Sequence, residues 1–179
     1  MATSSFLKRV STNIVEATTQ EFAQEAAITR RLLERTPADQ LAWKPHPKSM
    51  SLGALALHIA SSPEVFAGWI DKETIDLSES KEKPQPNSLA EILSTHEQSV
   101  KTVKKLLESL GEADVQGMCT LRKHGTTFMT MPKLAVLRTL VMNHLIHHRG
   151  QLSVYLRLLN VPVPSMYGPS ADESPFASV

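Results

Sequence analysis

The sequence predicts an all-α fold in which four long helices form one bundle. Four segments carry apolar side chains at helical spacing, and the rest of the chain offers too few strands for a sheet to carry a core. The chain has 179 residues, which suits one domain. Its content of 41% apolar and 21% charged residues is typical of globular proteins. We therefore expect a single domain over residues 1–179, with a core at about 10–160 and an irregular tail at 161–179.

The first two helices are expected at about residues 11–34 and 51–70. Thr36 ends the first helix, because a residue that precedes proline avoids the helical region. Pro63 lies inside the second helix and cannot donate a backbone hydrogen bond. A kink or a restart near Ser62 is therefore predicted.

The third helix has the clearest start of the four. Ser88 with Glu91 three residues later forms a capping-box pattern, and Gly111 stands where a helix ends. The segment 71–87 before it is charged and contains prolines, which predicts a long loop.

A change of pattern precedes the last long helix. Residues 126–130 are rich in threonine and favour extended structure, so a short hairpin is expected within 112–131. The fourth helix is expected to begin at Pro132, a favourable first-turn residue, and to run to about Leu159.

Charge and hydropathy exclude several functional classes. Lys and Arg number 19 and Asp and Glu 18, so there is no basic surplus for phosphate backbones and we expect no nucleic-acid partner. No apolar stretch is long enough to span a membrane, and the N-terminus lacks the core of a signal peptide. No membrane partner and a cytoplasmic location are therefore expected. The single cysteine, Cys119, can form no internal disulfide and is interpreted as structural.

The run NHLIHHRGQ carries the candidate site. His144 and His148 are four residues apart, which places them on one helix face, where two imidazoles can share a metal ion. At about 100° per residue, His148 falls near the middle of an apolar stripe and His147 falls on its shoulder. The alternative is a pair of core histidines, which would be costly to satisfy without a nearby carboxylate. Leu145 stands where zinc metalloproteases have a glutamate, so that class is excluded.

A third ligand must come from another helix, and the residues alone leave the choice open. His58 lies among small residues that leave room for an ion, and His96 lies in line with an apolar stripe. For each, a lone core histidine is the alternative. Glu97, Asp172 and Glu173 could complete a site, but nothing distinguishes them from carboxylates on a solvated face.

Four stretches of the sequence resemble the DinB/YfiT-like family of metalloenzymes. They are LAWKPHPKSMS at 41–51, LGALALHIA around His58, NHLIHHRGQLSVYLRLLNVPVP from Asn143, and YGPSADE in the tail. The resemblance spans about residues 10–173, and the HxxHHRGQ run is more specific than a bare HxxxH pair.

The resemblance implies a four-helix bundle of the DinB/YfiT type that holds one divalent ion. The ligands that it implies are His58, His144 and His148, which favours His58 over His96. The implied ion is nickel or zinc, with water in the remaining positions. Family members with known activity are similar to thiol S-transferases that use low-molecular-weight thiols, or to maleylpyruvate isomerase. A homodimer is implied as well.

Three neutral histidines leave coordination positions open, as in a catalytic site. We therefore expect a metal-dependent enzyme, thiol S-transferase-like or hydrolase-like, with a small-molecule substrate such as a low-molecular-weight thiol. The alternative is a non-catalytic, metal-stabilised protein that acts in stress or binds a small molecule. His147, Arg149 and Gln151 are candidates for contacts to the metal ligands or the substrate, although a surface or interface ion pair is the favoured interpretation of Arg149.

Overall fold

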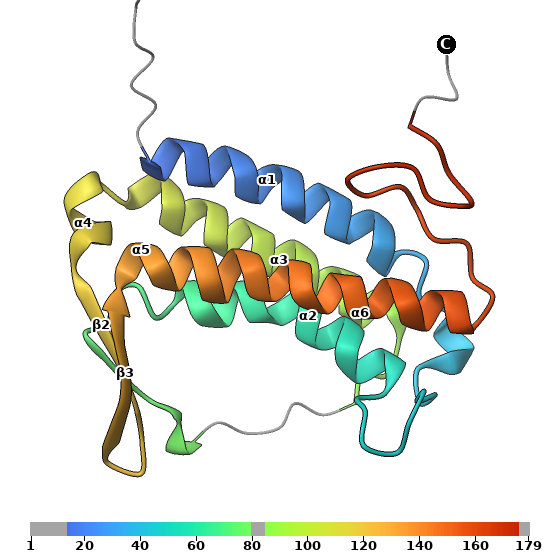
Figure 1. Cartoon of the computed structure of the whole chain (residues 1–179), viewed down its shortest axis with the longest axis horizontal. Helices are drawn as coiled ribbons and strands as arrows, with labels where there is room; N and C mark the ends of the chain where they lie inside the picture. The colour runs from blue at the N-terminus through green and yellow to red at the C-terminus, as the bar shows by residue number, and fades with distance from the viewer. Residues whose placement is uncertain (1–13, 80–84, 176–179) are drawn as a thin grey trace, which may run out of the picture.

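Four long helical stretches lie side by side in the computed structural model, which describes residues 14–79 and 85–175 (Figure 1). They are α1 (Ile14–Leu33), α2 (Leu52–Ala67), α3 (Leu89–Ser109) and a last stretch that ends in α6 (His144–Leu158). The predicted all-α bundle is confirmed, with a small sheet at one end. The predictions for residues before 14 and after 175 lie outside the described residues.

The second helix is capped as its sequence suggests and passes through its proline. The side chain of Ser51 accepts a hydrogen bond from the Ala54 amide at 3.1 Å. α2 is continuous through Pro63, so the predicted restart there is not observed. The amide of Glu64 donates to the hydroxyl of Ser99 at 3.1 Å. This bond ties the proline turn of α2 to the middle of α3.

The predicted start of α3 is confirmed, and α3 ends at Ser109, two residues before Gly111, where its end was predicted. The side chain of Ser88 accepts from the Glu91 amide at 3.1 Å. The Glu91 carboxylate accepts from the Asn87 amide, so the second bond of the capping box goes to the preceding residue. Gly111 has a φ of −95° and caps the start of the short helix α4 (Glu112–Gln116). It therefore does not supply the left-handed conformation of a helix C-terminal cap.

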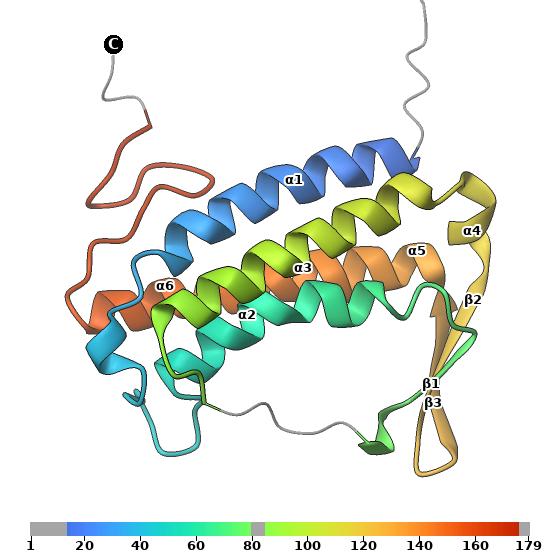
Figure 2. The same cartoon turned by 180° about the vertical axis from the view of Figure 1, so that it is seen from behind.

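A three-stranded sheet flanks one end of the bundle (Figure 2). β2 (Met118–Lys123) and β3 (Thr126–Pro132) are antiparallel and form the predicted hairpin. Its turn residues His124 and Gly125 have φ of 49° and 76°, as a tight two-residue hairpin turn requires. β1 (Thr74–Asp76) pairs in parallel with β2. The prediction of an unstructured loop at 71–87 is therefore wrong for these three residues.

The last helical stretch has three parts rather than one continuous α-helix. Pro132 is the N-cap of α5 (Lys133–Val136) and not its first residue. The segment Leu137–Asn143 is a π-helix, and α6 follows it without a break. A π-helix has i to i+5 hydrogen bonds and is frequent at functional sites. The α-helical rotation of about 100° per residue therefore does not apply to Leu137–Asn143, the segment directly before His144.

Two apolar clusters fill the bundle. The first joins the sheet to the helices through buried residues such as Phe22, Ile75, Val103, Leu121 and Val141. The second lies toward the other end and includes Leu32, Leu55, Ile92, Leu145 and Leu152. At mid-length each long helix contributes buried or half-buried polar residues, which we call the polar belt: Glu25, Thr29, Ser61, Ser62, His96, Ser99, His144 and Arg149.

The described part of the tail, residues 161–175, contains no helix or strand but is tied to the bundle. Asp172 pairs with Arg157 of α6, and Glu173 pairs with Arg31 of α1. Both carboxylates also accept hydrogen bonds from backbone amides within the tail. These contacts fix an irregular segment against two helices.

Candidate metal centre

Three histidines from two helices converge on one point. His58 comes from the middle of α2, and His144 and His148 come from the first turns of α6. The Nε2 atoms of His58 and His144 are 2.8 Å apart. One ring nitrogen from each of the three histidines lies within 4.8 Å of the others. Within residues 14–79 and 85–175, this is the one group of three or more metal-ligating side chains so placed.

His144 and His148 lie at the edge of the buried face of α6 and not at its centre. That face is formed by Leu145, Arg149, Leu152 and Leu156. His144 and His148 are half-buried and His147 is exposed. The sequence-based placement of His148 in the middle of the apolar stripe was wrong, because it carried 100° per residue across the π-helical segment.

The environment favours the neutral form of the His144 and His148 imidazoles. Burial lowers the pKa of His144 to about 4, and the neighbouring rings of His148, His58 and His147 add to the effect. Burial also lowers the pKa of His148, although its hydrogen bond with Gln151 opposes that shift. Neutral imidazole is the form that binds metal ions.

Gln151 fixes the orientation of the His148 ring. Its Oε1 lies 2.7 Å from Nδ1 of His148, and its Nε2 lies 3.1 Å from Nε2 of His147. An amide oxygen only accepts, so Nδ1 of His148 carries the proton and its Nε2 keeps a free lone pair. Such a partner typically orients a metal-binding histidine and fixes its tautomer. The predicted contact of Gln151 with the candidate ligands is therefore present.

An aromatic wall closes one side of the histidine group. Phe66 lies edge-on to His144, with ring centroids 4.9 Å apart. Trp69 lies edge-on to Phe66, also at 4.9 Å. These rings shield part of the group from water, which is consistent with the lowered pKa of His144.

The donor set fits a divalent transition-metal ion. Two imidazole Nε2 atoms 2.8 Å apart need a proton or a cation between them, since two lone pairs would repel. Imidazole ligands suit zinc, nickel, copper and iron. Three such ligands also leave coordination positions open for water or substrate.

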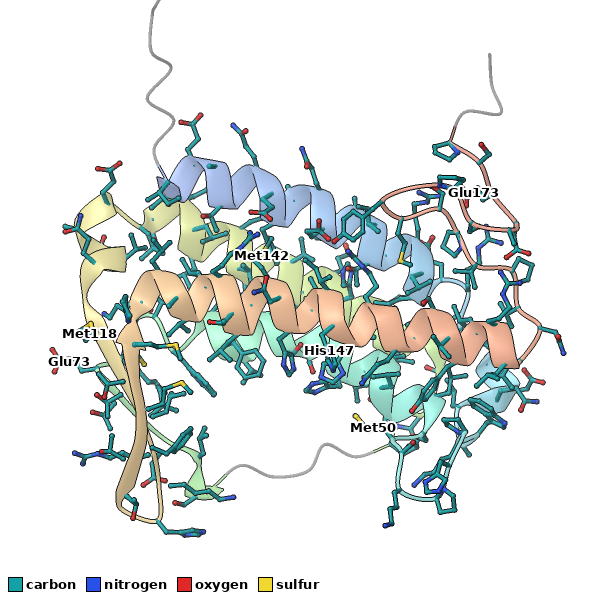
Figure 3. The ribbon with its side chains drawn as sticks, in the orientation of Figure 1. Met50, Glu73, Met118, Met142, His147 and Glu173 are labelled. Atoms are coloured by element: carbon teal, nitrogen blue, oxygen red, sulfur yellow. The ribbon has the colours of Figure 1, made fainter. Side chains whose placement is uncertain are left out.

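A cleft of about 920 Å³ opens beside the histidine group. His58, Phe66 and Trp69 line it, together with residues of the loop before α2 and of the sheet. Figure 3 shows His147 and Met50 on the same side of the bundle, the side toward which the sheet extends. A volume of this size accommodates a small organic molecule.

The other candidate ligands lie elsewhere. His96 is buried in α3 and does not belong to the histidine group. Glu97 is exposed and pairs with α1. Asp172 and Glu173 hold the tail, and Figure 3 shows Glu173 well away from His147.

Arg149 is in the core and not at the surface, so the favoured interpretation of this residue was wrong. Its side chain is 1% exposed and forms an ion pair with Glu25 of α1 at 2.5 Å. It also donates to Thr29, at 3.2 Å, and to the hydroxyl of Tyr167 from the tail. The same hydroxyl donates to Glu25 at 2.7 Å. The chain does not bring Arg149 to the three histidines.

Sequence reasoning missed Glu25 and Tyr167. A signal was present for the ion pair, because each charge lies on an apolar stripe. Glu25 is spaced at helical intervals with Phe22 and Leu32, and Arg149 is spaced likewise with Leu145 and Leu152. A charge at a core position predicts a buried partner, which here is the opposite charge.

Within the described residues, every helix is too short or too polar to cross a membrane.

Known proteins share this fold and part of this sequence. The model of the DinB family matches residues 9–175. An uncharacterized protein of Bacillus subtilis, YjoA, is 30% identical over 136 residues, which cover 76% of this chain and 84% of YjoA. A crystal structure of a DinB-like protein from Bacillus cereus matches with a TM-score of 0.69 at 24% identity, over 87% of this chain and 99% of that one. The crystal structure of YjoA matches with a TM-score of 0.66 at 24% identity, over 84% and 97%. The chain belongs to the DinB family.

Proposed function

We propose that this protein is a divalent-metal-dependent enzyme that activates a low-molecular-weight thiol for S-transfer. His58, His144 and His148 would hold one nickel or zinc ion. The observation that carries the proposal is the half-buried three-histidine group at the side of an open cleft.

The number of ligands and the access support catalysis over a structural role. Structural zinc sites are closed by four protein ligands, whereas catalytic sites keep a position open. Among the residues that the structure describes, no carboxylate or thiol joins the three histidines. His58 also lines the cleft, which is large enough for a small substrate.

The chain's own residues have separate tasks in such a reaction. A bound metal ion lowers the pKa of a thiol, so that the thiolate forms near neutral pH. Gln151 holds His148 with Nε2 toward the group, and Phe66 and Trp69 keep water from one side. The thiol proton leaves to solvent through the open cleft. The sulfur then forms a bond to the electrophilic carbon, and the leaving group departs with its electron pair.

A hydrolase is the second candidate, favoured by the coordination positions that three histidine ligands leave open for water. We prefer S-transfer because the described cleft residues include no carboxylate to act as a general base. A thiolate needs no such base once it has formed.

The test compares untagged wild-type protein with the variants His144→Ala and His124→Asn. His124 is an exposed histidine at the hairpin turn, and asparagine tolerates its positive φ, so His124→Asn is a matched control. We expect one nickel or zinc ion per chain in the wild type and the control, and none in His144→Ala. Conjugation of 1-chloro-2,4-dinitrobenzene to glutathione, cysteine or coenzyme A should disappear together with the metal.

Two results would overturn the proposal. Wild-type protein that takes up no nickel or zinc after reconstitution removes the metal centre. Protein that binds metal and melts at a higher temperature, but conjugates none of these thiols, supports the non-catalytic, metal-stabilised alternative.

A further inference from the structure

The cleft beside the histidine group carries charge of one sign. Lys44 and Lys48 line it from the loop before α2, and Lys123 lines it from the end of β2. The described lining residues include no aspartate or glutamate. Positive side chains therefore approach the cleft from two different elements.

This local charge does not reflect a basic protein. The whole chain has 19 basic and 18 acidic residues, so an average patch contains both signs. The described ion pairs all involve arginine, and none of the three cleft lysines has a described carboxylate within ion-pair distance. A cleft lined by one sign of charge concentrates ligands of the opposite sign.

The same cleft has a large apolar surface. Phe66 and Trp69 form its aromatic wall, and Val65 and Leu77 extend it. Val65 is 43% exposed and adds to this surface. An apolar group that covers this wall would remove it from water.

We propose that this cleft binds amphipathic organic anions, with the apolar part on the Phe66 and Trp69 wall and the anionic group among Lys44, Lys48 and Lys123. The inference rests on the proposed function in one respect, since it takes this cleft as the substrate cleft of the metal centre. It names the substrate class: a small carboxylate or sulfonate that carries an aromatic or alkyl group.

The test measures the binding of 4-phenylbutyrate and of its neutral analogue 4-phenylbutyramide to the full chain. Trp69 lines the cleft, so its fluorescence reports occupancy once Trp43, which packs on Tyr155, is replaced by phenylalanine. The titrations use metal-free protein and are repeated with zinc. We expect the carboxylate to bind about five-fold more tightly than the amide at low salt, with the preference shrinking as salt is added.

Two double variants test whether the cleft lysines cause the preference for the carboxylate. Lys48→Gln with Lys123→Gln removes two of the three cleft lysines and should weaken the preference for the carboxylate. Lys101→Gln with Lys104→Gln removes the same charge from the exposed side of α3 and should leave the preference unchanged.

Three results would overturn the inference. Equal binding of acid and amide, or binding of neither, would show that the cleft does not select anions. A preference that is undiminished in the Lys48 and Lys123 variant, or that appears only with zinc, would assign recognition to another group. Because the first titration needs no metal, failure of the metal centre and failure of this inference give different results.

Discussion

His96 is the buried histidine that the metal centre does not explain. It is 4% exposed, and its Nδ1 has no hydrogen-bond partner among the described residues. Burial lowers its pKa to about 4; Arg30 adds to the shift, while Glu34 and Glu97 oppose it. In the folded protein His96 is therefore neutral at pH 7, whereas the pKa of a histidine in an unfolded chain is about 6.5.

The stability of the protein should therefore depend on pH through His96. Because the folded pKa is the lower one, the unfolded chain binds the proton first, and stability falls as pH drops from 6.5 toward 4. The contribution of one such group is at most about 1.4 kcal/mol per pH unit. Urea unfolding of metal-free wild type and His96→Leu across this range would show it. We expect His96→Leu to become more stable relative to the wild type as the pH falls. Parallel profiles would contradict this expectation.

Spacing was sufficient to find His144, His148 and Gln151, because these residues are neighbours in one helical run. Only the resemblance to a family favoured His58 over His96 as the third residue of the group. The same reasoning failed for Arg149. A charged side chain is most often at the surface, and only its position on an apolar stripe indicated otherwise. Its partner Glu25 lies 124 positions away, so the sequence alone gave no reason to join the two.

The π-helical segment decides how the last helix meets the core. At about 100° per residue, Val136 would lie about 180° from Leu145 and would face water. It is instead fully buried in the first apolar cluster. The i to i+5 bonds of Leu137–Asn143 reduce the rotation per residue, so both Val136 and Leu145 can face the core. A pattern based on the period of 3.6 could not predict this element.

Deletion of one residue from the π-helical segment should test this account. Thr139 is exposed, and its removal would let the segment return to α-helical spacing. Eight residues would then separate Val136 from Leu145, which at about 100° per residue leaves the two about 80° apart. Both can therefore still face the core, and we expect the free energy of unfolding to fall by less than about 1 kcal/mol. Thr139→Ala removes the same side chain but keeps the π-helical segment, and it should also cost less than about 1 kcal/mol. If urea unfolding showed a much larger loss for the deletion than for Thr139→Ala, the π-helical segment would not be what keeps Val136 and Leu145 on one face.

Elements with strong local signals were predictable and those without were not. The serine cap of α3 and the hairpin turn were both indicated by local residues. β1 has three residues in a charged stretch and pairs with β2 about 45 positions further on. Its existence depends on that partner and not on its own sequence.

At the scale of the whole molecule, the polar belt lies between the two apolar clusters and contains both a buried ion pair and a candidate metal ligand. On one side of α6 it presents His144 toward His58 of α2. On the other side it presents Arg149 toward Glu25 of α1, where Tyr167 of the tail closes the contact. α6 is thus fixed from two sides by polar contacts whose partners are distant in sequence. Periodicity predicted the helices, but only the folded chain shows which polar groups meet.

The buried pair of Arg149 and Glu25 should contribute far more to stability than the exposed pair of Arg138 and Glu21. Both pairs join α1 to the last helical stretch, so they are matched in the elements that they connect. Arg149→Met leaves the Glu25 carboxylate buried without a cation, which typically costs about 3–5 kcal/mol. Arg138→Met removes a solvated pair and should cost less than about 1 kcal/mol. Urea unfolding measures both losses.

A second variant separates the loss of the pair from the loss of packing. Most of the cost of Arg149→Met comes from the stranded carboxylate and not from a missing attraction, because the desolvation penalty of a buried ion is large. Glu25→Leu combined with Arg149→Met should therefore recover much of the lost stability. If the double variant were as unstable as the sum of the single ones, the arginine would act through its packing among Thr29 and Tyr167. Arg149 would then hold α6 in place by its packing and not by its charge. Any effect of Arg149→Met on metal binding by His148, the preceding residue, would follow from the loss of that packing.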